Sequence, residues 1–452
     1  MLPIRYKLTA AAVFALTATL AWSKATPDEI ARLGRDLTPV GAEKAGNKDN
    51  TIPAWDGGLT KPPAGFDIKK GYTDPFASEK PLFTITNANA EQYKDKLSVG
   101  QLAMLKKYPT FKMIVFPSHR TAAYPENVME DVRKFAGSAD LAANANGVVG
   151  SGASTVPFPI PKKGEEVLWN DNLRWRGGGV ERDWNWHTVQ SSGDSYKVGV
   201  RERFIFENAG YLEPKRENQS FVITVEYTSP PTLEGTIYLA WDTLDQSKQA
   251  RQGWIYNAGQ RRVRRIPDLC CDFNPDGTDG MRFTDQYDGW NGTTERYDWK
   301  LLGKREMYVP YNTYKLTDKS LKPADVLHKN HLNPDLMRYE LHRVWAVEGT
   351  LKAGARHVIA KRTMFVDEDT WQLVVADLYD SRGNLWRYQD GPTIQYYDVQ
   401  VPWYAVFTIH DLTSGGYIVN QTSFDIAKPW KFGVKAKLAD FQPDELRRMG
   451  TK

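Results

Sequence analysis

An arginine cluster and two cysteines share one stretch of the chain, and such side chains could grip phosphates, bind a metal or carry redox chemistry. Four arginines occupy five positions between residues 261 and 265. In a strand, successive side chains point to opposite faces, so Arg261 and Arg265 face one side and Arg264 the other. A nucleic-acid grip would gather these charges on one face. We predict instead that these arginines pair with acids on neighbouring strands and that the protein binds no nucleic acid.

The cysteines, Cys270 and Cys271, are adjacent. A disulfide between neighbours strains the peptide that joins them, because their Cα atoms are only ~3.8 Å apart. Two small buried thiols are therefore the favoured interpretation, and a vicinal disulfide is the alternative.

The turn after the cysteines, residues 272–277 (DFNPDG), matches the opening of a calcium-binding EF-hand loop. That loop requires a bidentate Glu at its twelfth position, which is Phe283 here. A proline-led turn explains the same residues. Calcium binding stays open at this point, and the sequence predicts neither a metal site nor a cofactor.

Neighbouring carboxylates form the second candidate constellation. Asp367, Glu368 and Asp369 precede Trp371, and paired acids beside aromatic rings are typical of glycosidase clefts. The alternative is a turn whose acids pair with the arginine cluster. We favour the second interpretation, and assign Asp367, Asp369 and Asp380 to pairing across strands with Arg261, Arg264 and Arg265.

The N-terminus predicts export. Arg5 and Lys7 precede an apolar run over residues 8–22, and small residues follow at positions suited to cleavage. The run is too short for a comfortable membrane span. We predict a signal peptide over residues 1–25 and a periplasmic protein that can lie peripheral to the outer membrane. Removal of this segment lowers the net charge from +4 to +1, because it holds Arg5, Lys7 and Lys24 and no acid.

The mature chain divides into two regions by pattern. Residues 26–163 are rich in Pro, Gly and Asn, with helical spacing over residues 89–109 and 125–137. Residues 164–452 hold alternating strands with turn residues between them, and then a C-terminal extension. We predict a mainly β (α+β) fold with a large, curved antiparallel sheet or open β-barrel, and helices covering its concave face.

A curved sheet has a hollow side that could hold a ligand. The chain is rich in aromatic residues, with Trp 15, Tyr 22 and Phe 18. Aromatic and apolar walls with few polar groups suit an apolar ligand. The candidate cavity residues are Trp254, Tyr256, Val263, Phe365, Trp371 and Trp386, although strand parity places them on both faces.

Five long motifs resemble the DUF1329 family of exported proteins of Gram-negative bacteria. They lie at residues 47–58, 156–177, 253–272, 301–312 and 361–388, and the resemblance runs over residues 26–424. The family is similar to LolA/LolB-type outer-membrane lipoprotein-sorting proteins. The resemblance implies an open antiparallel β-barrel with helices on its concave side, and a non-enzymatic carrier for a lipid or other hydrophobic molecule. It also implies that the protein acts together with an MMPL-type inner-membrane exporter and with outer-membrane components.

Two other functions fit the same residues. A carbohydrate-binding or glycoside-hydrolysing protein would use the aromatic rings as sugar platforms and two opposed carboxylates as catalysts. An envelope scaffold would have a collapsed interior. A mainly apolar cavity with few acids would favour the carrier.

Overall fold

One large sheet organises the molecule. The computed structural model describes residues 24–450 except 208 and 268, so most of the expected signal peptide lies outside the described residues. The sheet has 16 strands and does not close into a barrel. Its strands run in the order β1 (Phe83–Ile85), β2 (Met113–Val115), β13 (Tyr339–Leu351), β14 (Lys361–Asp367), β15 (Leu373–Tyr379), β16 (Leu385–Asp390), β19 (Phe407–Asp411), β20 (Tyr417–Thr422), β5 (Gly179–Val189), β6 (Ser195–Phe206), β8 (Gln219–Ser229), β9 (Ile237–Thr243), β10 (Gln252–Asn257) and β11 (Arg262–Ile266).

Two further strands and three small pairs complete the β structure. β12 (Tyr297–Pro310) pairs with β13, and β21 (Lys431–Phe432) pairs with β5. Pairing in the large sheet is antiparallel apart from one parallel contact between β2 and β13. The small pairs are β17 (Thr393–Tyr396) with β18 (Val401–Tyr404), β7 (Leu212–Glu213) with β22 (Ala436–Lys437), and β3 (Asp140–Leu141) with β4 (Val148–Val149).

The helices are few and short: α1 (Pro27–Ile30), α2 (Val99–Lys107), α3 (Glu126–Phe135), α4 (Gly164–Leu173), α5 (Pro323–Val326) and α6 (Pro443–Gly450). The expected helix over residues 125–137 is confirmed as α3. The one over residues 89–109 is divided, because the Ser98 side chain caps the start of α2 and a separate 3-10 helix covers Ala90–Lys96. Among the described residues, no helix is long and apolar enough to cross a membrane.

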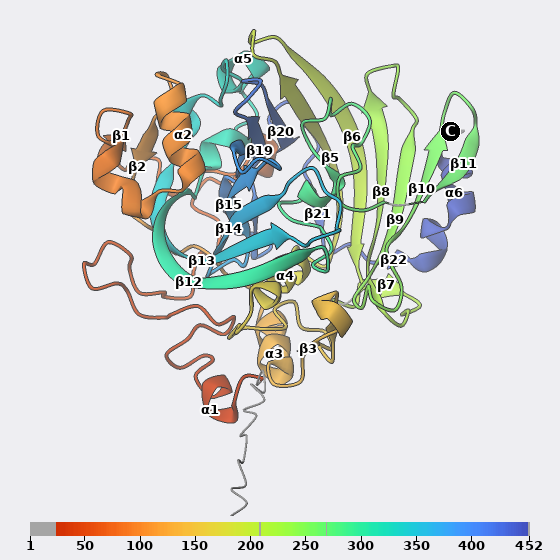
Figure 1. Ribbon diagram of the computed structural model, residues 1–452, viewed down its shortest axis with the longest axis horizontal. Coiled ribbons are helices and arrows are strands. Elements are labelled where there is room, and N and C mark those ends of the chain that lie inside the picture. The colour runs from red at the N-terminus through yellow and green to blue at the C-terminus, as the bar shows by residue number, and fades with distance from the viewer. Residues whose placement is uncertain (1–23, 208, 268, 451–452) are drawn as a thin grey trace, which may run out of the picture.

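The mainly β, strongly curved sheet predicted from the strand pattern is confirmed (Figure 1). The N-terminal region is part of it, because β1 and β2 extend the edge beyond β13. Residues 164–452, predicted as an antiparallel β-sheet region with a C-terminal extension, open with helix α4, which packs against β12 and β13. Helix α6 lies outside the curve, against β9, β10 and β11 (Figure 1).

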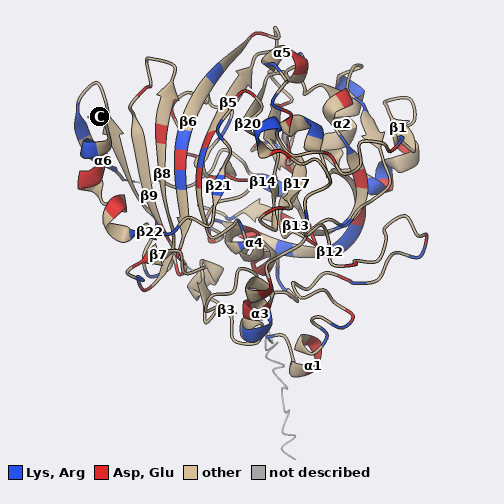
Figure 2. Cartoon of the chain, turned by 180° about the vertical axis from the view of Figure 1, so that it is seen from behind, with Lys and Arg blue, Asp and Glu red and all other residues tan. Residues whose placement is uncertain are grey.

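Alternation decides which side chains enter the core. On β6, Arg201 and Arg203 face outward and make cross-strand ion pairs with Asp183 (3.3 Å) and Glu181 (3.0 Å) on β5. Figure 2 shows these opposite charges side by side on β5, β6 and β8. Glu202, between the two arginines, faces the interior and is fully buried. The outer face of β5 and β6 is thus polar around these ion pairs, while an apolar cluster occupies the outer face nearer α6.

Candidate functional site

An apolar cavity lies on the inner face of β5, β8 and β9. It has a volume of about 90 Å³, and aromatic and aliphatic side chains dominate its wall. The sheet contributes Trp184, Trp186, Phe221, Ile223, Val225, Tyr227, Tyr238 and Ala240. No Asp or Glu is among its lining residues.

Strand alternation builds this wall. Phe221, Ile223, Val225 and Tyr227 are every second residue of β8, so they share one face. The intervening Val222 belongs to a separate cluster on the other face. This grouping follows the alternation read from the sequence, and it places the cavity under one face of the sheet.

A long connection between β11 and β12 covers the cavity. Its residues 269–291, the covering loop, supply the opposite wall with Leu269, Phe273, Pro275, Arg282, Thr284, Tyr287 and Asn291. Within these residues only a single 3-10 turn, Thr284–Gln286, is helical. This part of the inner face is therefore covered by irregular chain, whereas helices were expected.

Three of the aromatic side chains that line the cavity also bond to the tip of the covering loop. The Trp186 indole N–H donates to the carbonyl of Gly277 (2.8 Å), and the Tyr227 hydroxyl donates to the carbonyl of Asp276 (3.1 Å). The Tyr238 hydroxyl donates to the Asp276 carboxylate (2.8 Å). These hydrogen bonds hold the loop tip against the wall of the cavity.

The EF-hand-like turn lies at this tip. The Asp276 carboxylate accepts from Tyr238, and the Asn274 side-chain oxygen accepts from the hydroxyl of Thr278. Two of the oxygens that a calcium ion would need are thus bonded to protein donors. The turn therefore holds the tip of the covering loop in place through these hydrogen bonds.

The two cysteines form the disulfide that was the less favoured interpretation of the sequence. Cys270 and Cys271 are joined by a vicinal disulfide, with Cα atoms 3.7 Å apart, so the expectation of two free thiols is wrong. Cys271 is buried with a positive φ of 64°. Its carbonyl accepts from the backbone N–H of Asp285, which ties the two ends of the covering loop together.

The residues predicted to line a cavity lie elsewhere. Trp254, Tyr256 and Val263 face the cluster formed with Phe441 and Leu446, on the side of the sheet covered by α6. Alternation along β10 is the reason, since Gly253, which has the opposite parity, is the residue that faces Leu269 of the covering loop.

The other three candidates belong to the main core. Phe365 and Trp371 are buried there, and the Trp371 indole donates to the carbonyl of Val40 (2.8 Å). Trp386 is half-buried and donates to Asp411 (2.9 Å). None of the six lines the apolar cavity, whose wall among the described residues is formed by other side chains.

The predicted pairing between the arginine cluster and the acids is corrected as well. Arg261, Arg264 and Arg265 are exposed, and β11 is the last strand of the sheet, far from the β14–β15 turn in strand order. Asp369 pairs with Arg120 instead. Asp380 is half-buried and caps its own turn by accepting from the backbone of Arg382 and Asn384. Arg264 and Arg265 point to opposite faces of β11 as alternation predicts, whereas Arg261 lies in the turn before the strand.

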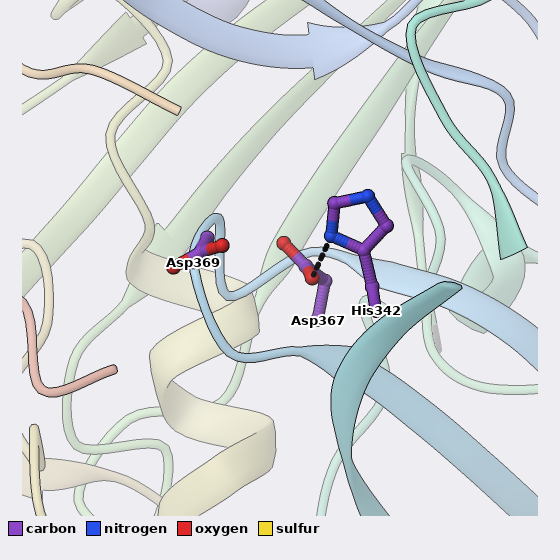
Figure 3. A group of neighbouring side chains, drawn as sticks. All are labelled: His342, Asp367 and Asp369. Carbon is purple, nitrogen blue, oxygen red and sulfur yellow. Dashed lines mark ion pairs between the residues drawn. The ribbon is translucent and has the colours of Figure 1, made fainter. Parts of the chain in front are cut away.

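The acids around residue 367 form a buried polar cluster with a histidine. In Figure 3, His342 from β13 faces Asp367 at the end of β14, and Asp369 follows on the turn. Nδ1 of His342 lies 3.9 Å from Oδ1 of Asp367. The Arg120 guanidinium donates to both oxygens of Asp369, at 2.8 and 2.7 Å. All four side chains are buried.

Burial sets the protonation of this cluster. Desolvation and the neighbouring Asp369 carboxylate raise the pKa of Asp367 to about 7. Burial opposes ionisation of Asp369 too, but the Arg120 guanidinium holds its pKa below the usual range. Burial disfavours protonated His342, yet its hydrogen bond to Glu340 and the charge of Asp367 raise its pKa.

The geometry of the cluster allows two interpretations, a cation site or an ion-pair network. Ligand atoms of His342, Asp367 and Asp369 all lie within 4.8 Å of one another. Both Asp369 oxygens, however, are engaged by Arg120, which already supplies the positive charge. The arrangement is therefore a buried ion-pair network, and its acids are not opposed across an open cleft.

Sequence reasoning missed Trp184 and Trp186, although a signal was present. They occupy alternate positions in RDWNWHTV, which is the pattern of a strand with two indoles on one face. Arg282 was also missed, because nothing near it in sequence indicates that residues 269–291 return over the sheet.

Comparison with other proteins identifies the family. The family described as "Protein of unknown function (DUF1329)" matches residues 84–447. PA3922 of Pseudomonas aeruginosa, an uncharacterized protein, is 45% identical over 447 residues, covering 98% of each chain.

Two solved structures of other proteins resemble part of this chain in the path of the backbone. A DUF1329 family protein from Desulfovibrio piger has 14% identity and a TM-score of 0.44, covering 63% of this chain and 97% of its own. A LolA superfamily protein from Nitrosomonas europaea has 13% identity and a TM-score of 0.38, covering 63% of this chain and 100% of its own. From the family match and the 45% identical relative, the chain belongs to the DUF1329 family.

Proposed function

We propose that the protein is a non-catalytic periplasmic carrier that binds a lipid or another hydrophobic molecule in the cavity under the covering loop. The observation that carries this proposal is the wall itself, where aromatic and aliphatic side chains meet from the sheet and the loop. Each methylene moved from water into such a site contributes ~0.8 kcal/mol, so an acyl chain can be held without covalent chemistry.

The size of the cavity implies movement of the loop. Ligand sites commonly span about 300–1,000 Å³, whereas this cavity measures about 90 Å³. A long acyl chain therefore enters only when the covering loop moves off β8 and β9. The hydrogen bonds from Trp186, Tyr227 and Tyr238 to the loop tip are the contacts that this movement breaks.

The carboxylates do not favour the alternative of sugar hydrolysis. A glycosidase cleft places two carboxyl groups within about 5–10 Å across an accessible site. The lining of the cavity has no acid, and Asp367 and Asp369 are buried in the ion-pair network. In the proposed role, the protein accepts its cargo from an MMPL-type inner-membrane exporter and delivers it towards the outer membrane.

Native mass spectrometry tests the proposal. The protein is purified without detergent from a periplasmic extract and weighed before and after solvent extraction. We expect an added mass near one lipid per chain that extraction removes and identifies. A bare chain that also gains no mass from added fatty acids, phospholipids or isoprenoids would contradict the carrier function.

A further inference from the structure

A buried arginine in the wall of the cavity faces no carboxylate partner. Arg282, on the covering loop, is 4% exposed. Its single side-chain hydrogen bond to a described residue runs from Nη1 to Oδ1 of Asn420 (2.8 Å), and its Nε has no partner there. A charge in such surroundings is costly unless it is paired.

The nearby acid is already occupied. Glu202 accepts from Nε of Arg182 (2.6 Å), and the Trp184 indole and the Tyr287 hydroxyl also donate to it. No carboxylate of a described residue lies within ion-pair distance of Arg282. Glu202 is thus paired with Arg182, and the positive charge of Arg282 has no paired acid among the described residues.

Aromatic rings offset part of this charge. The Arg282 guanidinium lies 5.0 Å from the ring centre of Trp186 and 5.5 Å from that of Tyr287. Such contacts stabilise a cation, but they do not neutralise it. Burial lowers the pKa of Arg282, in keeping with an incompletely balanced cation.

We propose that Arg282 binds the anionic headgroup of the ligand, so that the cargo is an amphiphile with a carboxylate or a phosphate on an apolar tail. The inference rests on the proposed carrier function and adds a charge requirement to it. A guanidinium meets either group with two parallel N–H donors, and its attraction is strongest away from water. The headgroup would supply the missing negative charge while the tail lies against Phe221 and Ile223.

The test compares three ligands that share one tail and differ in the headgroup. Oleate, oleyl phosphate and oleyl alcohol compete at pH 8 with the neutral fluorescent probe N-phenyl-1-naphthylamine. A charge-assisted hydrogen bond predicts that oleate, oleyl phosphate or both bind roughly tenfold to hundredfold more tightly than the alcohol. The anion that binds more tightly identifies the headgroup.

Variants assign the preference to one side chain. In Arg282→Gln the anionic ligands should bind less tightly while the alcohol binds as before, so the preference for the anion falls to within about twofold. Arg282→Lys should retain part of this preference. The control, Arg265→Gln, changes an exposed arginine on the opposite face and should keep the full preference.

The outcomes separate the two proposals. Equal binding of all three ligands to the natural protein, or an unchanged preference in folded Arg282→Gln, would overturn the headgroup assignment while leaving the carrier function intact. Failure of all three ligands to displace a bound probe would count against the carrier function itself. The comparison in the natural protein needs no variant, so it stands even if Arg282→Gln does not fold.

Discussion

Replacing Arg120 by Leu should lower the free energy of unfolding by about 3–5 kcal/mol, because it leaves a buried carboxylate without its counter-charge. Arg120 makes two hydrogen bonds with Asp369, at 2.8 and 2.7 Å, and lies 3.6 Å from Glu368. The side chains of all three are at most 3% exposed. Urea denaturation measures the change.

A surface ion pair supplies the control for Arg120. Arg201 pairs with Asp183 and Glu226 at 3.3 Å each, but its side chain is 52% exposed. Water screens such pairs, so Arg201→Leu should cost less than about 1 kcal/mol. The double variant Arg120→Leu/Asp369→Leu should recover part of the loss, since it leaves one buried acid fewer. A cost for Arg120→Leu no larger than that for Arg201→Leu would show that the cluster is solvated.

Replacing Ala240 by Phe should weaken the binding of an acyl ligand roughly tenfold to hundredfold. Ala240 lines the cavity from β9, opposite Ile223 of β8. A phenyl ring at this position takes up space that two or three methylenes of the ligand would occupy, at ~0.8 kcal/mol each. Displacement of a fluorescent probe by oleate measures the loss.

The same substitution outside the cavity is the control. Ala258 packs against the cluster on the α6 side of the sheet, so Ala258→Phe adds an equal ring on the face away from the cavity. Its affinity for oleate should stay within about twofold of the natural protein. Unchanged binding in a folded Ala240→Phe variant would mean that the ligand binds elsewhere.

Local sequence patterns predicted the strands of the sheet but not which residues lie next to one another in the folded protein. The alternating pattern predicted in residues 164–452 is confirmed in β8, where Phe221, Ile223 and Tyr227 share one face. It could not tell which face of β10 looks inward, because apolar residues stand on both faces, Trp254 and Tyr256 on one and Ile255 on the other. Trp254 was therefore assigned to the cavity, although it packs on the α6 side.

The charged network and the covering loop depend on distant contacts. Arg120 and Asp369 are 249 residues apart, so no spacing rule connects them. Asp369 was paired instead with the nearest conspicuous arginine cluster, which proves to be exposed at the far edge of the sheet. Arg282 lines the cavity only because the covering loop folds back over β8 and β9.

Quenching of tryptophan fluorescence by a brominated lipid tests the central claim most directly, because it reports both binding and position. Bromine quenches an indole only at close range, and Trp184 and Trp186 line the cavity. We expect 9,10-dibromostearate, but not stearate, to reduce the fluorescence with saturation near one ligand per chain. The Trp184→Phe/Trp186→Phe variant should lose most of this change, while Trp254→Phe keeps it. Absence of quenching, or its loss in Trp254→Phe alone, would contradict a ligand site in this cavity.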